Sequence, residues 1–428
     1  MLQNSWTDIP ETFDSQEELS ATKISPEIKY NSQEQPETHI LIEGDNYPVL
    51  QQLRGTATTA GSPSGGGLHV GTTIASSPSQ GGGQGVGGRI DIIYIDPPYT
   101  TGNAFTYNDD FSSTEGRHDA WLSFMNRRLA IARDLLADSG AIFIAIDQSE
   151  LYVLKLLCDK IFGEENFVND FMWLHGKGKK DTWSRTLQQH TLCYAKNKKS
   201  LKPFEEFQQT QWATKNADND PRGNWFSGSI SFSETRSNPN HKNYFSIKSP
   251  SGKVWTRQWQ CSKVEMNKLL EEKKIYWGPA PDYKSVPRKK IFNDESTKVI
   301  PRNIIDCVES TRAAQGHLDE LLGEKGVFDN PKPVDLITHL LEITNMGKDS
   351  LVLDFFGGSG TTLEAVCELN ARDGGNRKAI IVQKAEPCKE NQNRARFATI
   401  FDICKARCEK VSSIYSQPLS IYKLQNLQ

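Results

Sequence analysis

The sequence predicts an α/β protein built on a doubly wound, mostly parallel sheet. Short apolar runs alternate with segments of helical periodicity over most of the chain, which is the order of elements that such a sheet requires. Two of the runs, at 90–95 and 351–355, are apolar apart from a single Asp each, as expected of parallel strands buried on both faces. A proline pair follows the first run and a glycine-rich turn follows the second. This class of sheet binds its ligands at such turns.

The first half of the chain supplies one part of this sheet. Residues 1–38 are rich in Glu, Gln, Ser and Thr and lack apolar periodicity, so we expect a flexible N-terminal arm. Residues 39–202 then form the first α/β half. Its expected strands are 39–42, 90–95 and 141–146, and its expected helices are one that ends near Arg54, 121–137 and 150–161.

A segment of unusual composition, Gly55–Gly88, interrupts this half. It contains no Asp, Glu, Lys or Arg and consists almost wholly of Gly, Ser, Thr, Ala, Pro and Gln. Such a composition cannot bury enough apolar surface to offset the entropy lost on ordering the chain. We therefore expect a disordered insert between a helix and the next strand, at the end of the sheet opposite the ligands.

The amino-acid composition changes at about residue 203. Residues 203–320 are rich in Pro, Gly, Asn, Ser, Trp and Tyr and read as a separate, loop-rich module. The alternation resumes over 321–428, with helices expected at 333–343, 361–369 and 389–411 and strands at 350–355 and 378–383. The two α/β halves are therefore expected to form one discontinuous domain into which the module is inserted.

Charge and cysteine usage narrow the classes of partner. The formal net charge is −3, but basic clusters at 177–180, 196–199 and 288–290 all lie in the middle of the chain. A nucleic acid would bind there, although a solvated surface explains charge runs equally well. The eight cysteines include no Cys-x-x-Cys pair, and no apolar stretch approaches the ~18 residues of a membrane helix. We expect a cytoplasmic protein with no metal site.

The glycine-rich turn is a candidate cofactor site. Phe356–Thr362 follows a buried strand and opens a helix, so glycine backbone can approach a ligand and free N–H groups can bind its carboxylate or phosphate. Glu386, after the next strand, stands where a doubly wound nucleotide site places an acid on the ribose hydroxyls. A tight structural turn and a plain surface acid remain the alternatives.

The tetrapeptide Asp96-Pro97-Pro98-Tyr99 is more specific. Two prolines fix their own dihedrals and restrict the residues before them, so Asp96 and the Pro97 carbonyl become two rigid acceptors at the end of a strand. An exocyclic amino group offers two protons to such a pair, and Tyr99 offers a face on which a base can stack. A strand-terminating turn would need neither the acid nor the aromatic ring.

These residues resemble the amino-group DNA methyltransferases of the permuted type, in which the catalytic loop precedes the cofactor loop, and most closely the modification subunits of type III restriction-modification systems. The resemblance covers Leu41 to Val411. It is carried by 95–99 with 101–103 and 107–109, 140–147, 328–333, and, in the middle module, 221–225, 249–253 and 275–278. Three features depart from the family: the Gly55–Gly88 insert, Thr100 where Asn is usual, and a shorter chain.

The resemblance implies a Rossmann-like methyltransferase sheet that binds S-adenosylmethionine and double-stranded DNA. It makes a restriction subunit a candidate partner, and we also expect a homodimer. Asp45 is placed to reach the cofactor adenine, although it could equally cap the following helix. The implied cofactor-binding residues are Asp45, Phe328, Lys332, Pro333, Asp354, Phe356, Gly357, Gly358, Gly360, Thr361, Thr362 and Glu386.

The implied reaction is methyl transfer to N6 of an adenine flipped out of the duplex, with Asp96, Pro97, Pro98 and Tyr99 as the catalytic loop. A cytosine-N4 methyltransferase uses the same chemistry but more often begins this loop with Ser. RNA or protein-amide methylation is less favoured, and a catalytically inactive DNA-binding component is a further alternative. The module at 203–320 is expected to read the DNA sequence. Its candidate contacts are Arg222, Arg236, Arg257, Arg288, Lys289 and Lys290.

Overall fold

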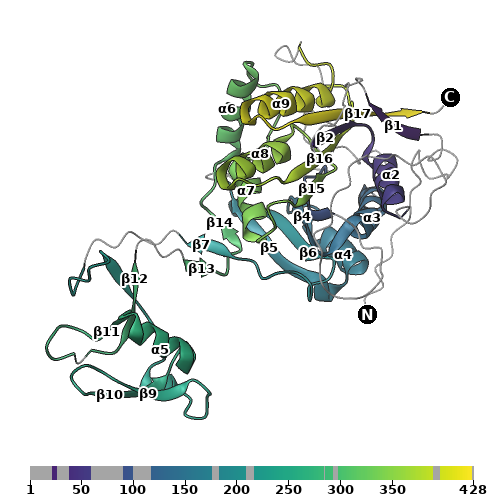
Figure 1. The fold of residues 1–428 in the computed structure, drawn as a ribbon. Helices are drawn as coiled ribbons and strands as arrows, with labels where there is room; N and C mark the ends of the chain where they lie inside the picture. The colour runs from purple at the N-terminus through teal and green to yellow at the C-terminus, as the bar shows by residue number, and fades with distance from the viewer. Residues whose placement is uncertain are drawn as a thin grey trace. The chain divides into compact units, whose positions relative to one another are not determined.

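The computed structural model describes nine stretches of the chain: 22–26, 38–58, 90–99, 117–175, 183–208, 216–283, 285–292, 297–388 and 396–426. They form two compact units (Figure 1). Unit 1 combines Met1–Phe204 with Pro301–Gln428, and unit 2 is Glu205–Ile300. No helix in the described stretches is long and apolar enough to cross a membrane.

Unit 1 is built on a ten-stranded sheet. In spatial order its strands are β1 (Thr22–Pro26), β17 (Leu419–Asn426), β2 (His39–Glu43), β16 (Lys378–Gln383), β15 (Leu351–Asp354), β3 (Ile90–Ile95), β4 (Leu136–Ile146), β6 (Gln188–Ala195), β5 (Phe167–Leu174) and β14 (Ile304–Ile305). The block from β17 to β4 is parallel throughout, whereas β1 and β6 run antiparallel to their neighbours. This confirms the predicted doubly wound, mostly parallel sheet.

Helices cover both faces of the sheet (Figure 1). Strand β3 shows how the faces divide, because Ile93 and Ile95 belong to one apolar core and Ile92 and Tyr94 to the other. The first core is closed by α2 (Asn46–Thr58), α3 (Arg117–Leu135) and α4 (Leu151–Phe162), and the second by α7 (Val334–Ile343), α8 (Thr361–Asp373) and α9 (Ile400–Tyr415). Apolar side chains on both faces of β3, with Asp91 as the one exception, are what a sheet covered on both faces requires.

Several boundaries differ from those expected. The second unit ends at Ile300 rather than at residue 320, because β14 pairs with β5 in the large sheet and α6 (Thr311–Leu322) packs on α9. Within the expected flexible arm, β1 pairs with β17 over five residues; the other residues of 1–37 lie outside the described stretches. Helix α9 begins at Ile400 rather than at 389, because Thr399 caps it and forms a capping box with Asp402.

The region of the predicted insert is described only at its start. Helix α2 continues to Thr58, four residues beyond its expected end, and residues 59–89 lie outside the described stretches. The residues after the catalytic tetrapeptide, 100–116, lie outside them as well, as do Lys177–Lys180. Strands β5, β6 and β17 were not among the predicted elements.

Unit 2 consists of small sheets around an aromatic core. Strands β11 (Ile275–Tyr276), β12 (Arg288–Phe292) and β8 (Trp225–Gly228) form one antiparallel sheet, β9 (Tyr244–Lys248) and β10 (Val254–Gln258) a hairpin, and β7 (Glu206–Gln208) and β13 (Thr297–Val299) a third pair. Helix α5 (Lys263–Glu271) buries Met266 among Trp255, Trp259 and Trp277. Single-turn 3-10 helices lie at Glu234–Arg236 here and at Glu164–Asn166 in unit 1.

Candidate active site

The tetrapeptide Asp96–Tyr99 extends from the carboxyl end of β3 and is fastened on both sides. The indole Nε1 of Trp121, on α3, donates to the Pro98 carbonyl at 2.8 Å. The hydroxyl of Ser149, after β4, donates to the Tyr99 carbonyl at 3.3 Å. Trp121 is fully buried, so the loop is tied to the core of the first sheet face and presents Asp96 at the edge of the sheet.

The two functional side chains of this loop are in contact. The Tyr99 hydroxyl donates to Oδ1 of Asp96, and Gln189, on β6, donates to the same hydroxyl at 3.0 Å. The ammonium of Lys332 donates to Oδ2 of Asp96 at 2.5 Å and to the Tyr99 hydroxyl at 3.1 Å. The family resemblance implied that Lys332 lines the cofactor site. In the structure its ammonium contacts the Asp96 carboxylate.

The glycine-rich loop leaves the neighbouring strand, β15. Gly357 donates its N–H to Val382 of β16 at 3.0 Å, and Gly358 donates to the side-chain carbonyl of Gln383 at 2.7 Å. A Cβ at position 357 would lie 2.5 Å from Cγ2 of Ile381. Gly360 has a φ of +83° and begins α8, and a Cβ there would lie 2.9 Å from Sγ of Cys408. Both positions therefore require glycine for the loop to pack on β16 and α9.

Asp354 lies beneath this loop. Its Oδ1 accepts from the N–H of Phe356 at 2.9 Å and its Oδ2 accepts from the hydroxyl of Thr362 at 2.6 Å. Burial raises the pKa of Asp354 to about 7, although both hydrogen bonds oppose the rise. The structure therefore uses Asp354 and Thr362, two of the expected cofactor-binding residues, to hold the turn together.

Arg407, a residue that the sequence did not single out, holds the same loop from the other side. This arginine is 1% exposed and lies on α9. Its Nη1 donates to the hydroxyls of Ser359 at 3.0 Å and Thr361 at 2.8 Å, and its Nε donates to Glu364 at 2.7 Å. His317, on α6, contacts the second oxygen of Glu364 at 2.6 Å. Thr361 thus also has a partner inside the protein.

Asp45 follows β2 at the same edge of the sheet. One oxygen accepts from the backbone N–H of Tyr47 at 3.0 Å, a contact typical of a residue that starts a helix. Arg128 lies 3.3 Å from that oxygen, and Lys384 lies 3.2 Å from the other. Burial alone would raise the pKa of Asp45, but these two cations hold it below its ordinary value.

A chain of contacts links Asp45 to the glycine-rich loop. The guanidinium of Arg128 lies 3.6 Å from the centroid of the Phe124 ring and donates to Asn46 at 2.5 Å. Asn46 in turn donates to the carbonyl of Phe355 at 2.8 Å, at the start of the glycine-rich loop. Phe124 lies beside Phe356, with ring centroids 5.9 Å apart. Arg128 is therefore a buried residue that holds this edge of the sheet together, and the sequence patterns did not identify it.

The other expected cofactor residues lie near the loop or at the same edge. Phe328 is buried, and its Cζ would be 3.6 Å from a Cβ placed on Gly358. Pro333 begins α7, directly after Lys332. Glu386 lies three residues beyond β16, and its backbone carbonyl accepts from the N–H of Ile400 at 2.8 Å.

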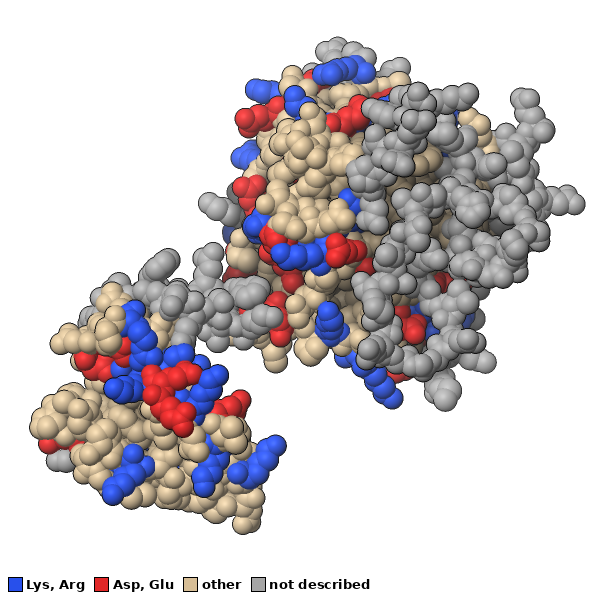
Figure 2. Space-filling model, viewed as in Figure 1, with Lys and Arg blue, Asp and Glu red and all other residues tan. Residues whose placement is uncertain are grey.

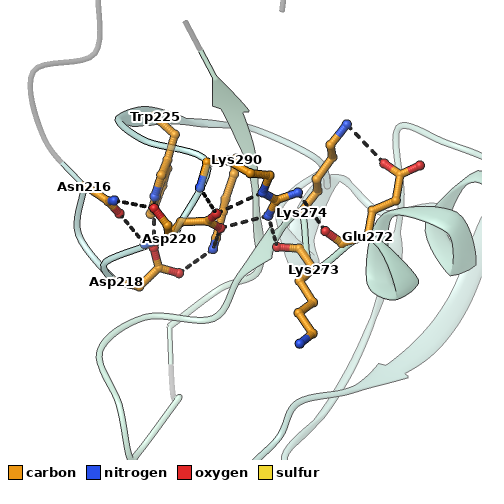
Figure 3. Close-up of polar contacts among 9 residues, drawn as sticks. Asn216, Asp218, Asp220, Trp225, Glu272, Lys273, Lys274 and Lys290 are labelled. Atoms are coloured by element: carbon orange, nitrogen blue, oxygen red, sulfur yellow. Dashed lines mark hydrogen bonds and ion pairs between the residues drawn. The ribbon is translucent and has the colours of Figure 1, made fainter. Parts of the chain in front are cut away.

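In unit 2, two of the six expected DNA contacts, Arg222 and Lys290, bind the same carboxylate, Asp220, which Figure 3 shows with Lys290. Lys290 is 5% exposed and forms ion pairs with Asp220 at 2.6 Å and with Asp218. Arg222 donates hydrogen bonds to Asp220 from Nε at 2.9 Å and from Nη2 at 2.8 Å. These bonds hold the pKa of Asp220 well below its ordinary range. Arg222 also donates to the carbonyls of Glu272 and Lys273. These contacts tie the module together and leave Lys290 buried, whereas the Arg222 side chain remains 38% exposed.

The other four candidates differ in exposure. Arg257 is buried and bonded to Glu234 and to the carbonyl of Phe232. Arg236 and Arg288 are exposed, and Lys289 is half-buried. Figure 2 shows basic side chains interspersed with acidic ones on the viewed face of this unit.

Comparison with known proteins decides the family. Residues 90–392, which run from β3 past β16 and include both loops, match the model of the N6/N4 DNA methylases, described as DNA methylase. The chain belongs to this family. The StyLTI Mod subunit of Salmonella typhimurium is 30% identical over 92% of this chain and 60% of its own length. The EcoPI Mod subunit of Escherichia phage P1 is 32% identical over 91% and 65%.

A third relative is matched over similar shares of both chains. The type II methyltransferase M.KpnI of Klebsiella pneumoniae is 32% identical over 76% of this chain and 82% of its own length. This chain spans about 60–65% of the length of the two type III Mod subunits. The solved structure of PvuII DNA methyltransferase aligns with 89% of the chain at 13% identity and a TM-score of 0.40, which is too weak to add to the assignment.

Proposed function

We propose that this DNA methylase transfers a methyl group from S-adenosylmethionine to N6 of an adenine in double-stranded DNA. The observation that carries the proposal is the adjacency of two loops. Strand β3 pairs in parallel with β15, through Ile92 with Val352 and Ile93 with Leu353. The Asp-Pro-Pro-Tyr loop and the glycine-rich loop therefore leave neighbouring strands at the same edge of the sheet, where a methyl donor and its acceptor can meet.

The residues at this edge fit the cofactor. S-adenosylmethionine, when bound, supplies a methyl group on a positively charged sulfur. The start of α8 offers N–H groups suited to a carboxylate, and Phe328 beside Gly358 provides an apolar wall. We place Asp45 and Glu386 at the adenosine end, because both follow strands at the ligand edge. Asp354, Thr361 and Thr362 serve indirectly, by holding the loop.

Asp96 and Tyr99 would act on the base. Flipping the adenine costs a few kcal/mol, and stacking on Tyr99 returns roughly 1–3 kcal/mol. The Asp96 carboxylate and the Pro97 carbonyl accept hydrogen bonds from the two N6 protons. This favours a pyramidal nitrogen whose lone pair is free to attack. Positioning and electrostatics then supply most of the acceleration.

We assign sequence recognition to unit 2 and its flanks, with the exposed or half-buried cations as candidate contacts: Arg222, Arg236, Arg288 and Lys289. Double-stranded DNA is the proposed substrate in the cytoplasm, a restriction subunit is a proposed partner, and a homodimer is the proposed assembly. Replacing Glu205–Ile300 with the corresponding module of a relative tests the assignment. We expect a different methylated site and an unchanged cofactor Kd; an unchanged site would contradict it.

The decisive experiment maps methylated bases in DNA from cells that express the protein. The proposal requires N6-methyladenine at a defined sequence, and its loss when Asp96 is replaced by Ala. N4-methylcytosine at the site would favour the alternative target base, which shares the amino-group chemistry. No methylated base in the presence of folded, cofactor-binding protein would refute the proposal and favour a DNA-binding component.

A further inference from the structure

Both oxygens of Asp96 are already occupied. Oδ2 accepts from the ammonium of Lys332 at 2.5 Å, and Oδ1 accepts from the hydroxyl of Tyr99. The side chain of Lys332 is 11% exposed and that of Asp96 is 27% exposed, so the pair is partly withdrawn from water. The proposed reaction needs one of these oxygens for a proton of the target amino group. A base that donates to Asp96 must therefore share the carboxylate with Lys332 and Tyr99, whose hydrogen bonds make it a weaker acceptor.

Lys332 also occupies the aromatic surface that the base would use. Its Nζ lies 5.3 Å from the centroid of the Tyr99 ring, within the range in which a cation is attracted to a ring face. The ammonium thus makes the two interactions expected of the target adenine: it donates N–H to Asp96 and it lies over Tyr99. The ammonium and the base would therefore compete for the same carboxylate and the same ring.

We propose that Lys332 is a positioning residue that holds the place of the target amino group at Asp96 and Tyr99 until the base enters. The inference rests on the proposed methyl transfer. As the bond from N6 to the methyl carbon forms and the carbon–sulfur bond breaks, N6 acquires positive charge and releases a proton toward Asp96. An ammonium still bound to that carboxylate would repel the developing charge, so Lys332 must leave before transfer.

The role has a structural advantage for the empty enzyme. Without a partner, the Asp96 carboxylate would be a partly buried charge, which is costly. Lys332 stabilises it and keeps Tyr99 oriented, with Gln189 as a second donor to the hydroxyl. Because Lys332 comes from the segment before α7 and Asp96 from the loop after β3, the lysine can withdraw without any change in strand pairing.

The test uses the full chain and a duplex that carries the mapped site with 2-aminopurine in place of the target adenine. This base fluoresces when it leaves the stack. We expect Lys332→Met to increase the extruded fraction about fivefold, because the base no longer competes with an ammonium. The KM for DNA should fall by about the same factor. Lys332→Arg keeps the cation and should restore the wild-type extrusion.

A matched control is available on α4. Lys155 pairs with Asp159 at 2.7 Å and lies outside the site, so Lys155→Met removes a paired ammonium without affecting extrusion. If Lys332→Met does not fold, Lys332→Gln removes the charge more conservatively and should still raise extrusion. Unchanged extrusion in either folded variant overturns the proposal. A weaker cofactor Kd would then assign Lys332 to the cofactor wall, and a slower single turnover would assign it to the chemistry.

The two proposals fail separately. If the mapping finds no methylated base with the wild-type protein, the proposed function is wrong. If the wild-type protein methylates adenine at a defined site and the Lys332 variants extrude 2-aminopurine no better than wild type, the proposed function stands and only the role of Lys332 is rejected.

Discussion

The two units each contain a carboxylate that is paired with a lysine above an aromatic ring. In unit 1, Lys332 binds Asp96 and lies 5.3 Å from the ring of Tyr99. In unit 2, Lys290 binds Asp220 and lies 5.4 Å from a ring of Trp225. The chemistry of the pairs is alike, yet we assign one to catalysis and the other to stability.

Their surroundings account for the difference. Asp220 is 5% exposed and binds a second cation, Arg222, besides Lys290 on β12. Asp96 is 27% exposed, has one cationic partner and stands at the carboxyl end of β3. A buried pair with every lone pair satisfied is costly to break, whereas a partly exposed pair at a ligand edge can exchange partners. An ion pair therefore indicates function only through its place in the fold.

The largest expected difference between the two carboxylate–lysine pairs is their effect on turnover. Asp96→Ala should lower methyl transfer by about 10²–10⁴-fold, because it removes the proton acceptor. Cofactor Kd should change little. Labelled-cofactor transfer to DNA and a cofactor titration of the same preparation measure the two quantities. Asp134→Ala is the control, since Asp134 forms an exposed pair with Arg54 on the outer side of α2 and α3. Near-normal turnover of folded Asp96→Ala would show that the Asp96 pair does not serve catalysis.

The converse substitution should affect stability. Asp220→Ala removes the carboxylate that Lys290 and Arg222 share, leaves Lys290 with Asp218 alone, and should lower the free energy of unfolding of unit 2 by up to about 3–5 kcal/mol. Asp306→Ala, which removes an exposed pair with Arg302, should cost at most about 1 kcal/mol. Denaturant unfolding followed by tryptophan fluorescence reports both values. Equal losses in the two variants would show that the Asp220 cluster is not a structural centre.

A third substitution separates stacking from proton acceptance within the catalytic cluster. Tyr99→Ala should cost ~1–3 kcal/mol of base binding and so weaken both flipping and turnover. Tyr99→Phe keeps the ring but releases the Asp96, Lys332 and Gln189 contacts of the hydroxyl. We expect the Phe variant to retain most of the flipping that the Ala variant loses, as measured with 2-aminopurine. Equal losses would assign the effect to the hydroxyl.

The smallest effect tests an ion pair of intermediate exposure, His317 with Glu364. Its hydrogen bond to Glu364 raises the pKa of His317 above its ordinary value of 6.5. The folded protein therefore binds the proton more tightly than the unfolded chain, so the added stability is complete below pH 6.5 and is lost as the pH rises through the folded pKa. The side chain is 44% exposed, so we expect at most about 1 kcal/mol. His317→Gln should remove this pH dependence from thermal unfolding curves.

The central sheet could be predicted because several of its strands have clear sequence patterns. Strands β3 and β15 lie in nearly continuous apolar runs followed by turns of fixed chemistry. Strand β6 was missed because it begins with Gln188, Gln189 and His190, and the polar start hides a strand whose remainder is buried. Helix α9 was expected to begin too early because helical periodicity does not mark an end, whereas the capping residue Thr399 does.

The candidate site was predictable where one motif carries it. Asp96, Tyr99 and the glycines stand next to strand ends in the sequence, so their place follows from the fold. Arg407 and Arg128 belong to helices and reach the edge only through tertiary packing, which no local pattern records. The basic run 288–290 shows the same limit. Strand alternation places Arg288 and Lys290 on the same face of β12, yet Arg288, at the start of the strand, is exposed, whereas Lys290 is buried against Asp218 and Asp220.

The order of strands also bears on how the chain acquires its structure during synthesis. Strand β2 is made early, yet its neighbours β16 and β17 are at 378–383 and 419–426. At a synthesis rate of ~5–20 residues per second, β2 emerges about 20 to 70 seconds before the first of these partners. Throughout that interval its two edges and its apolar residues have no native partner strand. We therefore expect nascent chains of this methylase to depend on chaperones until the last part of the sheet has left the ribosome.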